Sequence, residues 1–332
     1  MQHDTYKALV VEEAADGAYT RGIRTRPVSS LPAGEVLVRV GYSSLNHKDA
    51  LCASGNKGVT KRYPHTPGID AAGVVEDSRA AAFRRGDRVI VSGYDLGMNT
   101  PGGFGQLIRV PAGWVLPLPA GLTLEQSMAL GTAGFTAGMS VYKIIATVAP
   151  DQGDILVTGA TGGVGSIAAG ILCRLGYAVV GMSGKAGAGE FLARLGVTEV
   201  IPREQAVQDM ERPMLKARWA GVVDTVGGDV LAAAVKATRP LGLVTCCGNV
   251  ASPRLDLTVY PFILRGVTLA GIDSQNCPMT HRQVIWDRLA GEWRFDALAG
   301  LYDTVPLETL GERIDAMLRG ALKGRTVVDM GR

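Results

Sequence analysis

Four glycines stand close together in residues 155–165, where Ile155-Leu156-Val157 is followed by the letters TGATGGVG. The order of an apolar run, a glycine turn and a helix pattern is that of dinucleotide-binding folds, whose glycines are spaced G-x-G-x-x-G. Ala160, Gly162 and Gly165 occupy the three positions, so alanine replaces the first glycine. Gly162 would let the backbone approach a pyrophosphate, and Gly165 would let the helix pack closely on the strand.

A tight structural turn would also explain this pattern taken alone. Its place between a strand and a helix favours phosphate binding, because the free N–H groups and the helix dipole attract anions. Gly162 and the free N–H groups at the helix start are therefore the predicted contacts to a phosphate.

The strand predicted after this turn, residues 178–182, ends without a carboxylate. In NAD-binding proteins an Asp or Glu near this place accepts hydrogen bonds from the ribose 2′-hydroxyl. Here Ser183, Gly184 and Lys185 follow, and Arg203 follows the next strand. Each cation alone is equally well explained as an ordinary surface side chain. Together with the missing acid they predict NADPH, because cations attract a 2′-phosphate that a carboxylate would repel.

Two kinds of secondary-structure pattern surround these residues. Short apolar runs separated by Gly and Pro turns fill the first third and predict a barrel-like or sandwich-like β domain. They are residues 7–12, 36–40, 69–75, 88–91 and 104–110. From residue 124 strand and helix patterns alternate, beginning with a helix that Thr123 can cap. The strands there are uninterrupted Val/Ile/Leu runs, typical of a parallel sheet covered on both faces.

The expected fold is therefore α/β, with a doubly wound Rossmann sheet inserted into a mostly β domain. Residues 124–272 form the inserted unit, and residues 1–123 and 273–332 form the other. The last segment is too short for a domain of its own and is expected to return to the β domain. It holds predicted helices at 281–289 and 307–318 and a strand at 326–330.

Composition excludes several other classes. The net charge of +3 and the absence of a dense Lys/Arg block give no indication of nucleic-acid binding. The uncharged run 155–173 is broken by glycines, so no membrane segment is expected, and no signal peptide is indicated. Five cysteines without a C-x-x-C pair argue against a disulfide framework, and a reducing cytoplasm is expected.

Longer strings resemble the medium-chain dehydrogenases/reductases, and specifically their zinc-free YhdH/AcuI-type branch of quinone oxidoreductases and acryloyl-CoA reductases. The strings are residues 43–49 (SSLNHKD), 67–75 (PGIDAAGVV), 131–137 (GTAGFTA), 224–227 (DTVG) and 261–265 (PFILR). The resemblance covers nearly the whole chain. It implies a GroES-like domain around an inserted Rossmann domain, a homodimer, and a small-molecule enoyl-CoA or quinone substrate.

The zinc ligands of related enzymes are replaced here. Where those relatives present a cysteine and a later Gly-His-Glu, this sequence has Asn46 and Gly68-Ile69-Asp70. Zinc needs sulfur or nitrogen donors in tetrahedral geometry, and isoleucine offers neither. His47 and His65 remain, but two histidines do not make a site. We therefore expect no metal.

The resemblance also implies which residues contact the cofactor. They are Thr161, Gly162, Gly163, Val164, Ser183, Gly184, Lys185 and Arg203, with Asn249, Ile263, Ser274 and Arg325 as weaker candidates. His47 stands where the family usually has tyrosine, and it could stack near the nicotinamide or donate a hydrogen bond. The implied reaction is reduction of an activated C=C bond by hydride transfer, with acryloyl-CoA as the favoured substrate. Candidates for stabilising or protonating the developing enolate are Asn46, His47 and Tyr94. For Asn46, a turn-stabilising role is slightly favoured over a catalytic one.

Two alternatives stay open. The chain could be an NADPH:quinone oxidoreductase, which needs no protein acid, or a non-catalytic NADPH-binding protein. Turnover of a thioester, of a quinone, or of neither separates the three.

Overall fold

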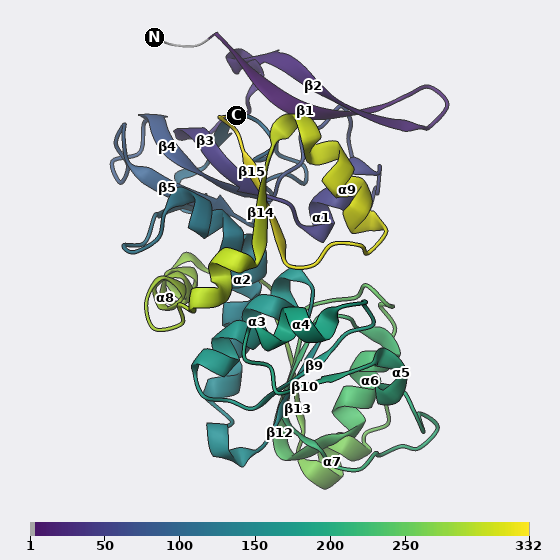
Figure 1. Ribbon diagram of the computed structural model, residues 1–332. Helices are drawn as coiled ribbons and strands as arrows, with labels where there is room; N and C mark the ends of the chain where they lie inside the picture. Colours follow the sequence, from purple (N-terminus) through teal and green to yellow (C-terminus); the bar gives the residue numbers. More distant parts are fainter. Residues whose placement is uncertain (1–3, 332) are drawn as a thin grey trace. The chain divides into compact units, whose positions relative to one another are not determined.

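The computed structural model describes residues 4–331. Contacts within the chain divide it into two units (Figure 1). The first unit runs to Thr132 and takes up Gln275–Ala290 and the chain from Tyr302 onward, while the second comprises Ala133–Ser274 and Gly291–Leu301. Relative to the expected boundaries at 123/124 and 272/273, residues 124–132 join the first unit and residues 291–301 join the second.

The first unit is built on β structure. A hairpin of β1 (Thr5–Glu13) and β2 (Tyr19–Pro27) accompanies a seven-stranded sheet in the order β14-β15-β3-β4-β5-β7, with β6 paired to β3. Its strands are β3 (Val36–Ser44), β4 (Asp70–Ser78), β5 (Arg88–Ser92), β6 (Leu107–Val110), β7 (Val115–Pro117), β14 (Tyr302–Pro306) and β15 (Arg325–Asp329). Val36, Val38 and Val40 are buried, which confirms the alternation expected there. Strands β2 and β14 were not expected, because exposed and polar residues interrupt their patterns.

Three α-helices belong wholly to this unit: α1 (His47–Ala53), α8 (Met279–Ala290) and α9 (Leu310–Leu318). Helices α1 and α9 pack side by side, as Figure 1 shows. Helix α2 (Leu124–Ile145) begins here, with the expected cap: the Thr123 hydroxyl accepts the backbone N–H of Gln126 at 3.0 Å. The chain breaks the helix at Gly131, whose φ of 52° and ψ of −156° are not helical. Residues 275–290 and the chain from Tyr302 onward lie in the first unit, where the last segment was expected to return.

The second unit is a six-stranded parallel sheet in the order β10-β9-β8-β11-β12-β13. The strands are β8 (Ile155–Thr158), β9 (Val179–Met182), β10 (Glu199–Ile201), β11 (Trp219–Asp224), β12 (Thr238–Cys246) and β13 (Thr268–Gly271). The helices are α3 (Gly163–Arg174), α4 (Ala188–Ala193), α5 (Arg203–Ala206), α6 (Gly228–Lys236) and α7 (Tyr260–Arg265). Every residue of β8, β9 and β11 is buried, as expected for a sheet covered on both faces. The doubly wound α/β fold is confirmed.

Five short 3₁₀ turns complete the elements: η1 (Val28–Ser30), η2 (Ala112–Trp114), η3 (Pro150–Gln152), η4 (Asp296–Gly300) and η5 (Leu307–Thr309). Across residues 4–331, none of the helices combines the length and apolar character needed to cross a bilayer.

Candidate functional site

A buried carboxylate lies at the start of one strand of the first unit. Asp70, the first residue of β4, is fully buried and accepts hydrogen bonds from three places. Oδ2 accepts from the Ser44 hydroxyl and from the Asn46 amide, each at 2.7 Å. Oδ1 accepts the Thr132 hydroxyl at 2.7 Å, and the Thr132 backbone N–H lies within 3.0 Å of both oxygens. These donors stabilise the charged form of a carboxylate away from water.

A second buried carboxylate, Asp49, lies in the first turn of α1. It accepts the backbone N–H of Asn46 at 2.8 Å and those of Gly68 and Ile69 at 3.1 and 2.8 Å. Burial raises its pKa to about 7, and the neighbouring charge of Asp70 acts in the same direction. The two sequence segments that contain Asn46 and Gly68 therefore both donate backbone hydrogen bonds to the Asp49 carboxylate.

Arg325 completes this group inside the first unit. It is 4% exposed, and its Nε and Nη1 donate to the carbonyls of Ala129 and Leu45 at 3.1 and 2.9 Å. Burial lowers its pKa, while the charges of Asp70 and Asp49 oppose that change. An ideal Cβ on Gly131 would lie 3.0 Å from Nη2 of Arg325. Arg325 thus lies beside the kink of α2, within the same group as the two carboxylates.

We call Asn46, Asp49, Asp70, Thr132 and Arg325 the carboxylate cluster. The sequence reasoning singled out Asn46 and Arg325 but missed Asp49, Asp70 and Thr132 as interacting residues. One feature of the sequence could have identified Asp49, Asp70 and Thr132. Each lies in one of the strings that resemble the family, at 43–49, 67–75 and 131–137 respectively.

His47 is the first residue of α1 and follows the cluster residue Asn46. Its side chain is largely exposed in the isolated chain, yet partial burial of the ring lowers its pKa below the ordinary value. A neutral imidazole offers one N–H donor and one acceptor at neutral pH. Of the three predicted catalytic residues, His47 is exposed, whereas Tyr94 is half-buried and Asn46 is buried.

Tyr94 has a different environment. Its ring stacks on that of Trp114, with centroids 5.6 Å apart and planes 6° from parallel, and the Arg282 guanidinium lies 4.8 Å from the Tyr94 centroid. Its hydroxyl donates to the Cys277 carbonyl at 3.4 Å, and its backbone N–H donates to the Gln275 carbonyl at 2.9 Å. Tyr94 therefore attaches the returning segment from Gln275 to the loop after β5.

In the second unit the glycine turn joins β8 to α3. The helix begins at Gly163, with Gly162 as its N-cap residue. An ideal Cβ on Gly165 would lie 2.4 Å from the Gly159 carbonyl oxygen, which shows that any side chain at this position would push the helix away from the turn. The close packing expected of Gly165 is thereby confirmed. The N-terminus of the twelve-residue α3 follows the carboxyl end of β8, and its free N–H groups can bind an anion there.

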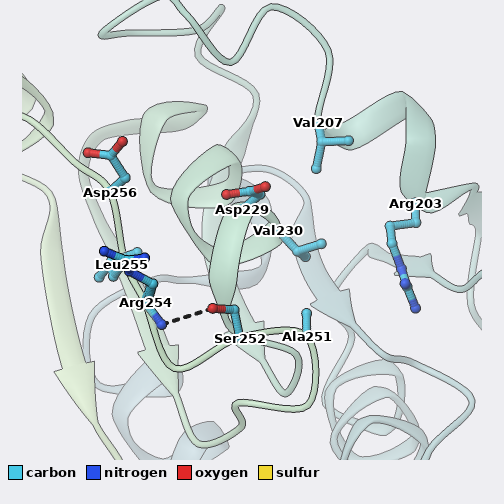
Figure 2. Close-up of a pocket in the computed structure, with 9 residues that line it drawn as sticks. All are labelled: Arg203, Val207, Asp229, Val230, Ala251, Ser252, Arg254, Leu255 and Asp256. Atoms are coloured by element: carbon cyan, nitrogen blue, oxygen red, sulfur yellow. Dashed lines mark hydrogen bonds between the residues drawn. The ribbon is translucent and has the colours of Figure 1, made fainter.

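The end of β9 lies against this turn. The hydroxyls of Thr161 and Ser183 are 2.9 Å apart, and the backbone N–H of Lys185 donates to the Ser183 hydroxyl at 3.2 Å. Arg203 begins α5 after β10 and lines a cavity in the same unit (Figure 2). Thr161 and Ser183, predicted as cofactor contacts from separate segments, are thus brought together by the structure.

Hydrogen bonds also join the carboxyl ends of β8 and β11. The buried carboxylate of Asp224 accepts the Thr158 hydroxyl at 2.7 Å and the Gly227 N–H at 2.9 Å, and burial raises its pKa. The Thr225 hydroxyl donates to the Thr158 carbonyl at 2.8 Å. The string at 224–227 therefore shapes the edge of the sheet beside the glycine turn.

Three weaker candidates remain, of which Asn249 lies beside Gly227: an ideal Cβ on Gly227 would be 3.0 Å from the Asn249 Cα. Asn249 is exposed in the loop after β12, and Ser274 is the last residue of the second unit before the chain leaves it. Ile263 lies on α7, where its side chain is 67% exposed. The helix ends at Arg265, which donates to the Lys236 and Thr238 carbonyls at the amino end of β12. The structure does not group Ile263 with the glycine turn.

Residues 4–331 contain no group of three or more His, Cys, Asp or Glu side chains that could hold a metal ion. Asn46 is engaged with Asp70, and Ile69 donates only its backbone N–H to Asp49. The residues at these two positions, where zinc-dependent relatives have metal ligands, thus form hydrogen bonds within this chain.

Comparison with known proteins agrees with this architecture. The model of the alcohol dehydrogenase GroES-like domain matches residues 32–120, and that of the zinc-binding dehydrogenases matches residues 163–290. The chain is 39% identical over 327 residues to the acrylyl-CoA reductase AcuI of Ruegeria pomeroyi, covering 98% of this chain and 99% of the relative.

Two solved structures are similar over their whole length. The YhdH oxidoreductase of Salmonella enterica, in complex with NADP, has a TM-score of 0.95 and 38% identity, with 98% and 99% of the two chains covered. YhfP of Bacillus subtilis, with NAD bound, has a TM-score of 0.95 and 39% identity, with 99% and 100% covered.

Proposed function

Because the chain belongs to the medium-chain dehydrogenase/reductase family, we propose that it reduces activated C=C bonds with NADPH, converting acryloyl-CoA to propionyl-CoA without zinc. One observation carries the proposal: the glycine turn contacts the end of β9. The residues there are Ser183 and Lys185, and no acid is present among residues 183–185. AcuI, at 39% identity, supplies the substrate class.

The residues present fit the cofactor. The N-terminus of α3 offers backbone donors, Gly162 lets the backbone approach a pyrophosphate, and Gly165 lets α3 pack closely on the turn. Lys185 and Arg203 provide positive charge for a 2′-phosphate. The YhdH structure holds NADP and the YhfP structure holds NAD, so the choice between them rests on this chain's own side chains.

NADPH, when bound, supplies a hydride for the β-carbon of the enoyl thioester. The protein must then stabilise the negative charge that develops on the thioester oxygen, and a proton must reach the α-carbon. We assign the contact with the reacting substrate to His47, whose neutral ring can donate one N–H. Asn46 and the carboxylate cluster hold the start of α1, and with it His47, in place.

The test of cofactor choice is Lys185→Glu, with Lys216→Glu as a matched control. Lys216 is an exposed lysine of the same unit, located before the amino end of β11. We expect Lys185→Glu to weaken NADPH binding far more than NADH binding and Lys216→Glu to affect neither. Equal losses for both cofactors would refute the 2′-phosphate assignment.

The test of substrate choice follows the absorbance of reduced nicotinamide with acryloyl-CoA and with a small benzoquinone. We expect turnover with the thioester. Turnover of the quinone alone would favour the NADPH:quinone oxidoreductase, and binding of NADPH without turnover of any enone or quinone would favour a non-catalytic protein.

We also propose a homodimer formed through the free edge of β13. This strand ends the six-stranded sheet, and the neighbouring β12 and α7 expose large apolar side chains. Leu241 is 78% exposed, and Leu264 on α7 is 66% exposed. A second copy related by a two-fold axis would extend the sheet and cover these side chains. Light scattering should show a dimer that Leu264→Glu converts to monomer; a monomeric wild-type protein would overturn the proposal.

We place the protein in the cytoplasm. All five cysteines have free thiols in the structure, which suits a reducing compartment. Fractionation of the source cells with an antibody to the chain tests this assignment, and recovery outside the cytoplasm would contradict it.

A further inference from the structure

A cavity of about 680 Å³ in the second unit is lined by apolar and acidic side chains as well as by arginines, and phosphate binding does not explain the acidic ones. Three segments line it, each following the carboxyl end of a strand: α5 after β10, the start of α6 after β11, and the loop after β12 (Figure 2). The lining residues are Arg203, Val207, Asp229, Val230, Ala251, Ser252, Arg254, Leu255 and Asp256. The glycine turn opens at the same edge of this parallel sheet.

The cavity draws on both halves of the sheet. Strand order runs outward from β8 to β10 on one side and from β11 to β13 on the other, so the change of direction lies between β8 and β11. Ligands of open α/β sheets bind at this change, outside the carboxyl ends of the strands. Arg203 comes from one half, whereas Asp229 and Ser252 come from the other. A ligand whose phosphate meets Arg203 would therefore place its adjacent group in this cavity.

The walls suit a flat heterocycle with an exocyclic amine. Val207, Val230 and Ala251 provide apolar surface for the faces of a ring. The carboxylate of Asp229 lies between the Arg203 end and the Asp256 end of the lining, as Figure 2 shows. Within residues 4–331 that carboxylate has neither a hydrogen-bond donor nor an ion-pair partner. A carboxylate accepts hydrogen bonds only, so it would select a donor such as an amino group and repel a carbonyl oxygen.

We infer that Asp229 recognises the 6-amino group of the adenine base and thereby makes the site selective for adenine among purine dinucleotides. This inference rests on the proposed NADPH binding and adds a specificity-determining residue to it. The hydrogen bond runs from the adenine amino N–H to a carboxylate oxygen of Asp229. Hypoxanthine has a carbonyl oxygen at that position, which would face the carboxylate with no proton between them.

The experiment compares NADPH with its deamino analogue, nicotinamide hypoxanthine dinucleotide phosphate in reduced form. Both have the same fluorescent dihydronicotinamide, so one titration protocol measures both dissociation constants. We expect the wild-type protein to bind NADPH roughly tenfold more tightly than the analogue, the usual range for one hydrogen bond to a charged group. Asp229→Ala should bring the ratio close to one, mainly by weakening NADPH binding.

Two further variants sharpen the test. Asp229→Asn should also bring the ratio of the two dissociation constants close to one, because its amide can accept from the adenine amino group and can equally donate to the hypoxanthine oxygen. Asp256→Ala, a carboxylate of the same cavity, should keep the wild-type ratio. Thermal melting checks that each variant is folded.

The outcomes distinguish adenine recognition by Asp229 from NADPH binding itself. Equal binding of both dinucleotides by the wild-type protein, or an unchanged ratio in Asp229→Ala, overturns the inference while NADPH binding stands. Failure of the wild-type protein to bind either dinucleotide overturns the proposed function itself.

Discussion

The side-chain amide of Asn46 donates a 2.7 Å hydrogen bond to Oδ2 of Asp70. The same amide lies 3.3 Å from the Ser44 carbonyl, and the backbone N–H of Asn46 donates to Asp49. Asn46 is therefore fixed at both its backbone and its side chain, and it is 8% exposed. Since His47 follows it at the start of α1, we propose that Asn46 acts as a positioning residue for the imidazole.

Asn46→Ala tests this role. The variant removes one buried donor from Asp70, so the free energy of unfolding should fall by roughly 1–3 kcal/mol. Turnover should fall as well, because the start of α1 loosens, while the dissociation constant of NADPH stays unchanged. Urea denaturation and fluorescence titration measure the two quantities. A variant with wild-type stability and no turnover would instead make Asn46 a catalytic residue.

Gly131→Ala tests the kink in α2. An added Cβ would lie 2.5 Å from the Ser44 hydroxyl and 2.6 Å from Oδ2 of Asp70, at a backbone conformation that favours glycine. We expect a loss of more than about 2 kcal/mol in the free energy of unfolding. Gly311→Ala is the matched control, because its Cβ would meet open space within α9 and should be neutral or stabilising. Similar effects of both changes would contradict the proposed role of the kink.

The pKa of Asp49 predicts a pH dependence of stability. Burial, followed by the charge of Asp70, raises it from 3.8 to about 7 in the folded protein. The folded state therefore binds the proton more tightly than the unfolded state. The resulting stabilisation is complete below the unfolded pKa and is lost as the pH rises through about 7. Asp49→Asn should remove this slope between pH 4 and about 7 in urea denaturation; a wild-type slope in the variant would point to other groups.

The sequence predicted those features that depend on neighbouring residues. The glycine turn, the cap at Thr123 and the buried strands of the second unit follow from local spacing and are present. The close approach of Gly165 to Gly159 also belongs to this class, because both residues lie in one turn.

The carboxylate cluster could not be predicted in the same way. Asp70 and Thr132 are 62 positions apart, and they meet only because β4 and the kink of α2 bring them together. Tyr94 and Cys277 are 183 positions apart. No local pattern distinguishes a tyrosine that faces a substrate from one that stacks between an arginine and a tryptophan, so Tyr94 was considered a candidate proton donor on its position alone.

Tyr94→Phe separates the two roles of that residue. The ring keeps its contacts with Trp114 and Arg282, and the hydroxyl loses only one hydrogen bond of 3.4 Å. We expect turnover close to that of the wild type and a stability change within about 0.5 kcal/mol. A proton donor would lose roughly a hundredfold or more in kcat. Steady-state kinetics with the thioester decides, and such a loss would make Tyr94 catalytic.

Gly165→Ala tests the phosphate-binding turn in the second unit. The added Cβ would lie 2.4 Å from the Gly159 carbonyl oxygen, so α3 must shift and its N-terminal N–H groups would no longer align with the pyrophosphate. We expect NADPH and NADH to bind at least about tenfold more weakly, since one misplaced charged hydrogen bond costs about that much. Gly189→Ala in α4 is the control, because its Cβ would meet no atom within 4 Å and should leave both dissociation constants nearly unchanged. Should Gly165→Ala bind both dinucleotides like the wild type, the pyrophosphate would have to lie elsewhere on the sheet edge.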